Sequence, residues 1–146
     1  MTLDILLVES DPLVRDHIKV GLQQFPEFAV TVATGYRGVD QLRSRAFDCV
    51  FLGVDPRNAE TSGLLQHLRS FDKQSEVIVV TEGRNVKDMA ADKGRYNVHM
   101  FLPTPVDPAT LFAFVGRFRE RRAAKAGPDS TKASQPRVKR PAKATS

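Results

Sequence analysis

Polar side chains that could support phosphoryl or metal chemistry follow several apolar segments of this chain: Glu9, Ser10, Asp11, Thr81 and Thr104. Carboxylate and hydroxyl oxygens suit Mg²⁺, and a transferring phosphoryl group needs its charge neutralised by such groups together with a metal and an ammonium. The segment VFLGVDP raises a question about this chemistry. Gly53 stands at the end of its apolar run, and the nearest carboxylate, Asp55, follows two residues later.

Five apolar runs alternate with five segments of helical pattern, and these elements must position the polar residues. The runs cover residues 3–8, 28–33, 48–54, 76–81 and 98–102, and helices are expected from Pro12 to about Phe25 and within 35–47, 62–71, 85–94 and 107–122. Three of the runs are apolar throughout, which is typical of strands buried on both faces. The pattern therefore predicts an α/β fold, with a parallel sheet covered by helices on both sides.

Capping residues and apolar spacing indicate the helix boundaries and buried faces. Asp11 and Pro12 suit the start of the first helix, Gly94 suits the C-cap of the fourth, and Asp107 caps the fifth. The first helix is expected to bury Leu13, Val14, His17, Ile18, Gly21 and Leu22. The last helix is expected to bury Leu111, Phe112, Phe114, Val115 and Phe118.

Parallel sheets of this class place functional groups at the carboxyl ends of their strands. The residues at 9–11, 53–56, 81–83 and 103–105 are therefore expected to lie at one edge of the sheet. Cys49 is the only cysteine. The chain has acidic residues near its start and no cationic segment before its first apolar stretch, and no apolar stretch is long enough for a membrane span. These features favour a soluble, cytoplasmic protein without a signal peptide, membrane span or disulfide.

The motifs ILLVESDPLVR, FDCVFLGV, LLQHLR, VIVVT and FLPTPVDPATL occur in order between residue 3 and about residue 120. In this the chain resembles the receiver domains of bacterial two-component response regulators. The resemblance implies a doubly wound (βα)5 flavodoxin-like, CheY-like sandwich with strand order 2-1-3-4-5. It also implies a receiver-like domain at 1–122 that works in phosphorelay signal transduction, and a cis peptide bond between Thr104 and Pro105.

A working receiver needs an acidic pair for Mg²⁺, an acceptor Asp, a Ser or Thr, and a Lys before a Pro. At the matching positions this chain keeps Glu9 and Thr81 but has Ser10, Gly53 and Thr104 for the second acid, the acceptor and the lysine. The pattern therefore resembles a stand-alone pseudo-receiver: not an enzyme, without a cofactor, and acting as a phosphorylation-independent protein-binding module.

An alternative hypothesis keeps the phosphoryl chemistry with Asp55 as a displaced acceptor and Mg²⁺ at Glu9. On an extended strand the Asp55 side chain would lie about 6.6 Å beyond that of residue 53 and point the same way. Counting from Gly53 aligns LLQHLR with the family without a gap, which favours Gly53 as the acceptor position. Glu9 and Asp11 could still bind a divalent ion weakly, although Asp11 is equally explained as a helix cap.

The resemblance also implies a partner-binding surface. In the family this surface comprises the fourth helix, the fifth strand and the fifth helix, here around residues 86–94, Phe101 and 111–122. Lys87, Phe101 and Arg117 are the residues expected to contact a histidine kinase or another regulator, and the same surface could support a homodimer. Phe101 also matches the aromatic switch residue of receivers, although a simple core role is favoured here.

The basic charge of the chain is concentrated at its C-terminus. Residues 121–146 contain eight Lys or Arg and one Asp, a charge of +7, whereas residues 1–120 carry −2. The segment 123–146 is polar and rich in Pro, Ser and Lys, and is predicted to be a disordered basic tail. Its RVKRPAKA motif could contact nucleic-acid phosphate without sequence specificity, which gives a third hypothesis, a nucleic-acid-associated protein.

Overall fold

The computed structural model describes residues 2–133 of the 146 in the chain. The chain divides into two compact units, with the boundary between Leu111 and Phe112. The first unit contains the sheet and most of the helices. The end of the predicted tail, residues 134–146, lies outside the described residues, so its proposed contact with polyanions stays a prediction.

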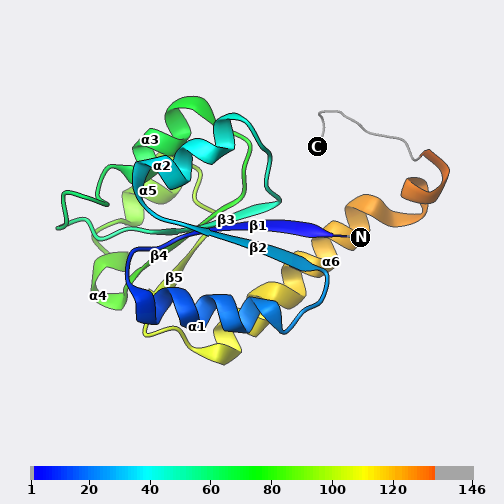
Figure 1. Cartoon of the computed structure of the whole chain (residues 1–146), viewed down its shortest axis with the longest axis horizontal. Coiled ribbons are helices and arrows are strands. Elements are labelled where there is room, and N and C mark those ends of the chain that lie inside the picture. Colours follow the sequence, from blue (N-terminus) through cyan, green and yellow to red (C-terminus); the bar gives the residue numbers. More distant parts are fainter. Residues whose placement is uncertain (1, 134–146) are drawn as a thin grey trace. The chain divides into compact units, whose positions relative to one another are not determined.

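Five parallel strands form one sheet, in the order β2-β1-β3-β4-β5 (Figure 1). Their bounds are β1 Leu3–Val8, β2 Phe28–Ala33, β3 Cys49–Gly53, β4 Val77–Glu82 and β5 Met100–Thr104. The fold class and strand order expected from the sequence are confirmed. β5 begins two residues later than expected, and the Thr104–Pro105 peptide bond is cis, as the resemblance implied.

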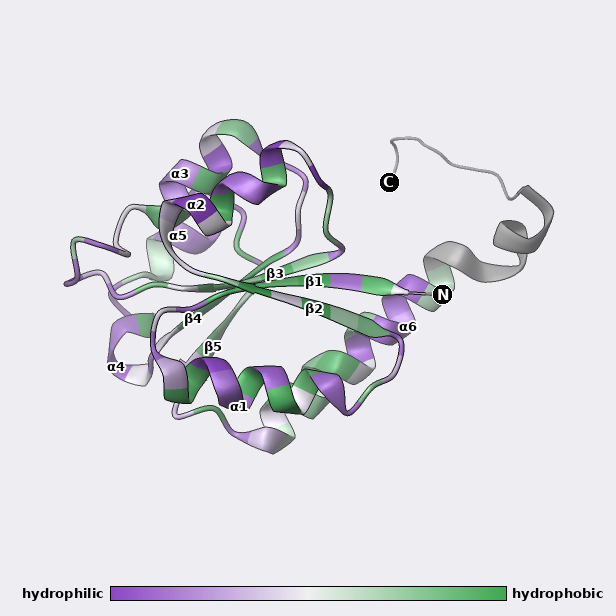
Figure 2. Cartoon of the chain, viewed as in Figure 1, coloured by the Kyte–Doolittle hydropathy of each residue, from purple (hydrophilic) through white to green (hydrophobic). Residues whose placement is uncertain are grey.

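Short helices connect the strands: α1 Pro12–Gln23, α2 Gly35–Asp40, η1 Gln41–Arg43 (a 3-10 turn), α3 Leu64–Phe71, α4 Gly83–Val86 and α5 Ala90–Arg95. Helix α1 covers one face of the sheet, and α2 and α3 cover the other (Figure 1). All residues of β1, β3 and β4 are buried except Asp4 and Glu82. This burial on both faces explains their nearly continuous apolar sequences, which are visible in the hydropathy colouring (Figure 2).

Helix α1 begins as predicted, but fewer of its residues are buried than the sequence pattern predicted. The Asp11 carboxylate accepts hydrogen bonds from the backbone N–H of Leu13 at 2.9 Å and of Val14 at 3.4 Å. Ile18 and Leu22 are fully buried. Leu13 and His17, which were expected inside, are exposed. His17 precedes the buried Ile18 by one position and Leu13 precedes the half-buried Val14, and one residue rotates a helix by about 100°.

The predicted fourth helix is divided into two short ones. Helix α4 ends at Val86 and α5 starts at Ala90. The expected C-cap at Gly94 is wrong, because α5 continues through Gly94 to Arg95 and is capped by Tyr96. The left-handed residue that redirects the chain is Asn97, at φ 53°.

A buried arginine fastens the amino-terminal side of the sheet. Arg69 is 7% exposed, and its guanidinium donates hydrogen bonds to four backbone carbonyls, those of Asp72, Ser75, Tyr96 and Asn97, at 2.7–3.1 Å. A buried cation must be satisfied in this way to be tolerated. The loops that enter β4 and β5 are thus tied to α3, and the opposite ends of the strands are left for the cleft described below.

The second unit is described only through helix α6, Pro108–Ala133, which spans both units. Phe114, Val115 and Phe118 are buried as predicted, but Phe112 is 46% exposed, contrary to expectation. The helix also runs past the predicted start of the tail at residue 123, where the segment AAKA (123–126) has high helix propensity. No helix among the described residues has both the length and the apolar character required to cross a bilayer.

Candidate functional site

A cleft of about 420 Å³ opens at the carboxyl ends of β1, β3 and β4. It brings together the residues singled out in the sequence: Glu9, Ser10, Asp11, Gly53, Asp55, Thr81 and Thr104. Thr81 and Glu9 are buried, whereas Ser10 and Asp11 are exposed. No Lys or Arg is among the described residues that line the cleft, so its carboxylates are not balanced by a cation from its own wall.

The Glu9 side chain occupies the space beside Gly53. The register of β1 against β3 pairs Val8 with Leu52, which places Glu9 next to Gly53 at the ends of the two strands. A Cβ atom added to Gly53 would lie 2.6 Å from Cδ and 2.9 Å from Oε2 of Glu9, and would also collide with Oε1. Gly53 therefore provides the space that the Glu9 carboxylate fills.

Burial determines the electrostatics of Glu9, which is only 9% exposed. Desolvation raises the pKa of its carboxyl group, and the negative charge of Asp11 adds to this effect. Backbone N–H groups act in the opposite direction, among them the Asp11 N–H, which donates to Glu9 Oε2 at 3.1 Å. The result is an acid held inside the cleft by backbone donors.

Thr81, which the sequence placed in the site, is held by a residue that the sequence analysis missed. Asn85 of α4 is 2% exposed, and its Nδ2 donates to Thr81 Oγ1 at 3.1 Å. Burying two polar side chains is tolerated because they satisfy each other. A polar residue four positions after Thr81, at the start of a helical segment, was the available signal for this pair.

Asp55 organises the loop between β3 and α3 and is engaged with Arg57. Its carboxylate accepts a hydrogen bond from the Arg57 backbone N–H at 3.0 Å and lies 3.5 Å from Arg57 Nε. These interactions, the backbone bond first, lower the pKa of Asp55. Its backbone N–H donates to Thr61 Oγ1 at 2.9 Å, and the Thr61 hydroxyl donates to the Asp55 carbonyl at 3.2 Å.

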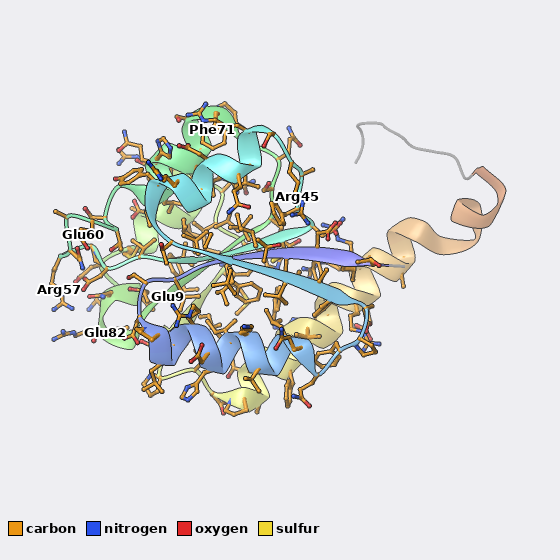
Figure 3. The ribbon with its side chains drawn as sticks, in the orientation of Figure 1. Glu9, Arg45, Arg57, Glu60, Phe71 and Glu82 are labelled. Atoms are coloured by element: carbon orange, nitrogen blue, oxygen red, sulfur yellow. The ribbon has the colours of Figure 1, made fainter. Side chains whose placement is uncertain are left out.

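An ion-pair network joins this loop to the end of β4. Arg57 Nη2 lies 2.9 Å from Glu82 Oε1, and Arg84 Nε lies 2.8 Å from the same oxygen. Figure 3 shows Arg57 and Glu82 close together at the end of the sheet where Glu9 also lies. The two arginines, Arg84 first, lower the pKa of Glu82. The sequence analysis missed Arg57, because its partner is 25 residues away in the chain.

Two carboxylates were predicted to bind a divalent ion weakly, Glu9 and Asp11. The Asp11 side chain caps α1, and Glu9 is turned toward Gly53. Among the residues whose side chains the structure describes, no three or more His, Cys, Asp and Glu lie close enough together to bind a metal ion. Ion binding at Glu9 and Asp11 stays a prediction.

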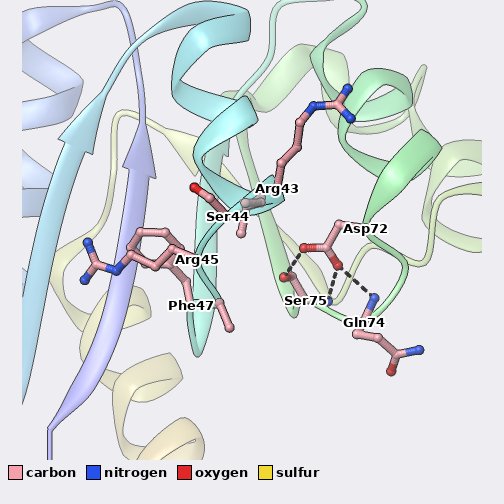
Figure 4. Close-up of a pocket in the computed structure, with 9 residues that line it drawn as sticks. Arg43, Ser44, Arg45, Phe47, Asp72, Gln74 and Ser75 are labelled. Atoms are coloured by element: carbon pink, nitrogen blue, oxygen red, sulfur yellow. Dashed lines mark hydrogen bonds between the residues drawn. The ribbon is translucent and has the colours of Figure 1, made fainter.

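A second hollow, of about 430 Å³, lies at the opposite ends of β3 and β4 (Figure 4). Its polar groups are engaged locally: the Asp72 carboxylate accepts hydrogen bonds from the Ser75 hydroxyl and from the backbone N–H of Gln74 and of Ser75. Arg43 and Arg45 point away from Asp72 and lie over aromatic rings. This hollow therefore offers no convergent chemical groups.

Gly53→Ala tests the close approach of Glu9. The added methyl group must displace the carboxylate, which is the end of a flexible side chain, and we expect the free energy of unfolding to fall by about 1 kcal/mol, the low end of overpacking costs. In a Glu9→Ala background the same change should cost almost nothing. Gly94→Ala is the matched control, because its Cβ meets no atom within 4 Å and a helical Gly→Ala change should stabilise by about 0.5–1 kcal/mol. Urea unfolding measures all three, and an equal cost with and without Glu9 would contradict the contact.

Glu9→Gln tests the buried charge. Because the folded-state pKa of Glu9 lies above that of the unfolded chain, the charged form destabilises the fold at neutral pH, and this cost disappears as the pH falls to about 4.5. We expect Glu9→Gln to be more stable than the native chain at pH 7, with the difference closing at pH 4. Urea unfolding at both values measures it, with exposed Glu60→Gln as the control. A difference independent of pH would disprove the charge effect.

Comparison with known proteins agrees with this architecture. Similar solved structures include the N-terminal domain of an uncharacterized protein from Wolinella succinogenes (24% identity, TM-score 0.67, covering 86% of this chain and 99% of that chain). The REC domain of the Geobacillus stearothermophilus response regulator AraT is also similar (18%, 0.71, 87% and 100%). A third is the chemotaxis response regulator CheY4 of Vibrio cholerae (17%, 0.67, 81% and 99%).

These identities are low and show the fold alone, and no curated protein sequence matches the chain significantly. The family model described as "Response regulator receiver domain" matches residues 5–116, more than half of the chain. That range includes four of the five strands, most of β1 and every residue of the cleft. The chain therefore belongs to the response regulator receiver domain family, the receiver domains of two-component signalling.

Proposed function

We propose that this receiver domain acts as a pseudo-receiver, a protein-binding module in two-component signalling whose activity does not depend on phosphorylation. The observation that carries the proposal is the pair of Glu9 and Gly53. Gly53 offers no carboxylate as an acceptor, and the Glu9 carboxylate fills the space beside it. A phosphoryl group brought to this position would meet the buried Glu9 carboxylate, which a backbone N–H already binds, instead of an Asp at the acceptor position.

The rest of the cleft supports the same proposal. Phosphoryl transfer requires cations, because negative charge on the phosphoryl oxygens must be neutralised by metal and ammonium groups. Ser10 supplies no second carboxylate for Mg²⁺, and Thr104 supplies no ammonium. Thr81, the hydroxyl that remains, is bonded to Asn85.

The alternative acceptor, Asp55, has a different use in this arrangement. Its carboxylate receives the Arg57 backbone N–H, and Arg57 in turn extends to Glu82. Phosphorylation would convert the Asp55 carboxylate into an acyl phosphate, and the bulky, negatively charged phosphoryl group would disturb this turn. The geometry favours Asp55 as an anchor for Arg57, and the titration described below distinguishes the two roles.

The proposed partner is a signalling protein, such as a histidine kinase or another regulator, that docks on α4 and β5. Lys87 at the end of α4 is exposed and can meet an acidic group of a partner. Phe101 of β5 is only partly buried and contacts the core cluster, so it can act as a core residue while leaving an apolar edge at the surface. Arg117, also expected to contact the partner, is exposed on α6.

An amide-resolved NMR titration with Mg²⁺, followed by beryllofluoride as a mimic of an acyl phosphate, tests phosphorylation independence. We expect no saturable shifts at Gly53, Asp55, Thr81 or Phe101, because the cleft lacks both the acceptor and the ammonium. A receiver that retains the acceptor Asp is the positive control. Saturable shifts that disappear in Asp55→Asn would contradict the proposal and identify Asp55 as the acceptor.

Charge reversal at Lys87 tests the docking face. Lys87→Glu should weaken capture of the partner from an extract of the source cells by about tenfold or more, because like charges then face each other across the interface. Arg37→Glu, an equally exposed reversal on α2, is the matched control and should leave capture unchanged. Equal capture by all three proteins would show that α4 is not the docking face.

A further inference from the structure

We propose that Arg57 is a brace that ties the β3–α3 loop to the start of α4 through its ion pair with Glu82. The proposal deepens the proposed function, since α4 carries the suggested docking residue Lys87. The inference itself concerns only the isolated protein. It rests on three sets of contacts, at the loop, across the gap, and within α4.

Within the loop, the backbone holds Arg57 in a fixed position. The Thr61 hydroxyl closes the loop by bonding both the N–H and the carbonyl of Asp55. Thr61 is only 8% exposed, so this closure is shielded from water. The Asp55 carboxylate then binds the Arg57 N–H and lies near its Nε. Arg57 thus leaves the loop already oriented, and less conformational entropy is lost when it binds its partner.

Across the gap, Arg57 reaches the last residue of β4. Its Nη2 lies 2.9 Å from Glu82 Oε1, and both side chains are 52% exposed. An isolated exposed pair of this kind stabilises a fold by only about 0.2–1 kcal/mol. Here Glu82 sits between two arginines, because Arg84 also binds Oε1. The two pairs differ in one respect: Arg84 is two residues from Glu82, whereas Arg57 belongs to another loop.

At the start of α4, a buried hydrogen bond supplements the ion pair. Glu82 is both the last residue of β4 and the N-cap residue of α4, so its ion pair with Arg57 lies at the junction of the two elements. The Thr81 hydroxyl and Asn85 amide fasten the first turn of α4 to the end of β4 from the inside. The start of α4 is therefore held from the outside by Arg57 and from the inside by Asn85.

Asp55 and Arg57 thereby acquire a shared role that phosphoryl chemistry does not explain. Because residue 53 is Gly, the end of β3 has no side chain there that could be phosphorylated. The cleft nevertheless keeps a charged connection between the segment after β3 and the segment after β4. The positive charge of Arg57 meets the negative charge of Glu82, so this connection needs no added ion or phosphate.

The experiment compares Arg57→Gln with Arg84→Gln, which removes the same charge next to Glu82 but breaks no contact between segments. Amide hydrogen exchange is measured by NMR on the full chain without a partner. We expect Arg57→Gln to accelerate exchange in residues 83–95 by up to about fivefold, the range set by an exposed ion pair. Exchange in α1 should not change, and Arg84→Gln should leave residues 86–95 unaffected.

Salt provides a second measurement on the unmodified chain. Raising NaCl from 0.05 to 1 M should screen the pair and shift the amides of α4 in the native protein, but not in Arg57→Gln, where the pair is already absent. The brace is disproved if Arg57→Gln changes only residues 55–61, or if Arg84→Gln has the same effect on α4. Neither readout involves partner capture, so failure of the brace is distinguishable from failure of the docking proposal.

Discussion

The contact between Glu9 and Gly53 is the constraint on which the arrangement of the cleft depends. The parallel pairing of β1 and β3 brings positions 9 and 53 side by side at the ends of the strands. In this arrangement a Cβ at position 53 would overlap the Glu9 carboxylate, so a side chain there would require Glu9 to turn away. With Gly at 53, the longer Glu9 side chain folds inward and becomes buried. The same geometry that could support an acceptor in a receiver supports a buried acid here.

The other features of the cleft are consistent with this buried acid. A charged carboxylate in a poorly solvated place raises the free energy of the fold unless donors compensate it, and backbone N–H groups at the start of α1 supply such donors. Thr104 contributes no cation. Arg57 instead pairs with the carboxylates of Asp55 and Glu82, and Arg84 pairs with that of Glu82. Both arginine side chains are exposed and lie outside the cleft wall. The two arginines of this region therefore bind the carboxylates that follow β3 and end β4.

Local patterns predicted most of the fold and the composition of the cleft, and long-range contacts explain what they missed. Strands buried on both faces leave an apolar run, so β1, β3 and β4 could be identified directly. Glu9 and Thr81 follow such runs, and so their convergence could be expected. The inward rotation of Glu9 could not, because it depends on the register of β1 and β3. Arg57 and Arg69 act through partners distant in the chain, and neither differs locally from a surface arginine.

Magnitudes determine what the Arg57 brace can do. Moving a two-state equilibrium from 1:99 to 99:1 requires about 5.5 kcal/mol. An exposed ion pair supplies about 0.2–1 kcal/mol, which changes a population by no more than about fivefold. The pair of Arg57 and Glu82 is therefore too weak to act as a switch between two forms of α4. It can only favour a form that the buried Thr81–Asn85 hydrogen bond already holds.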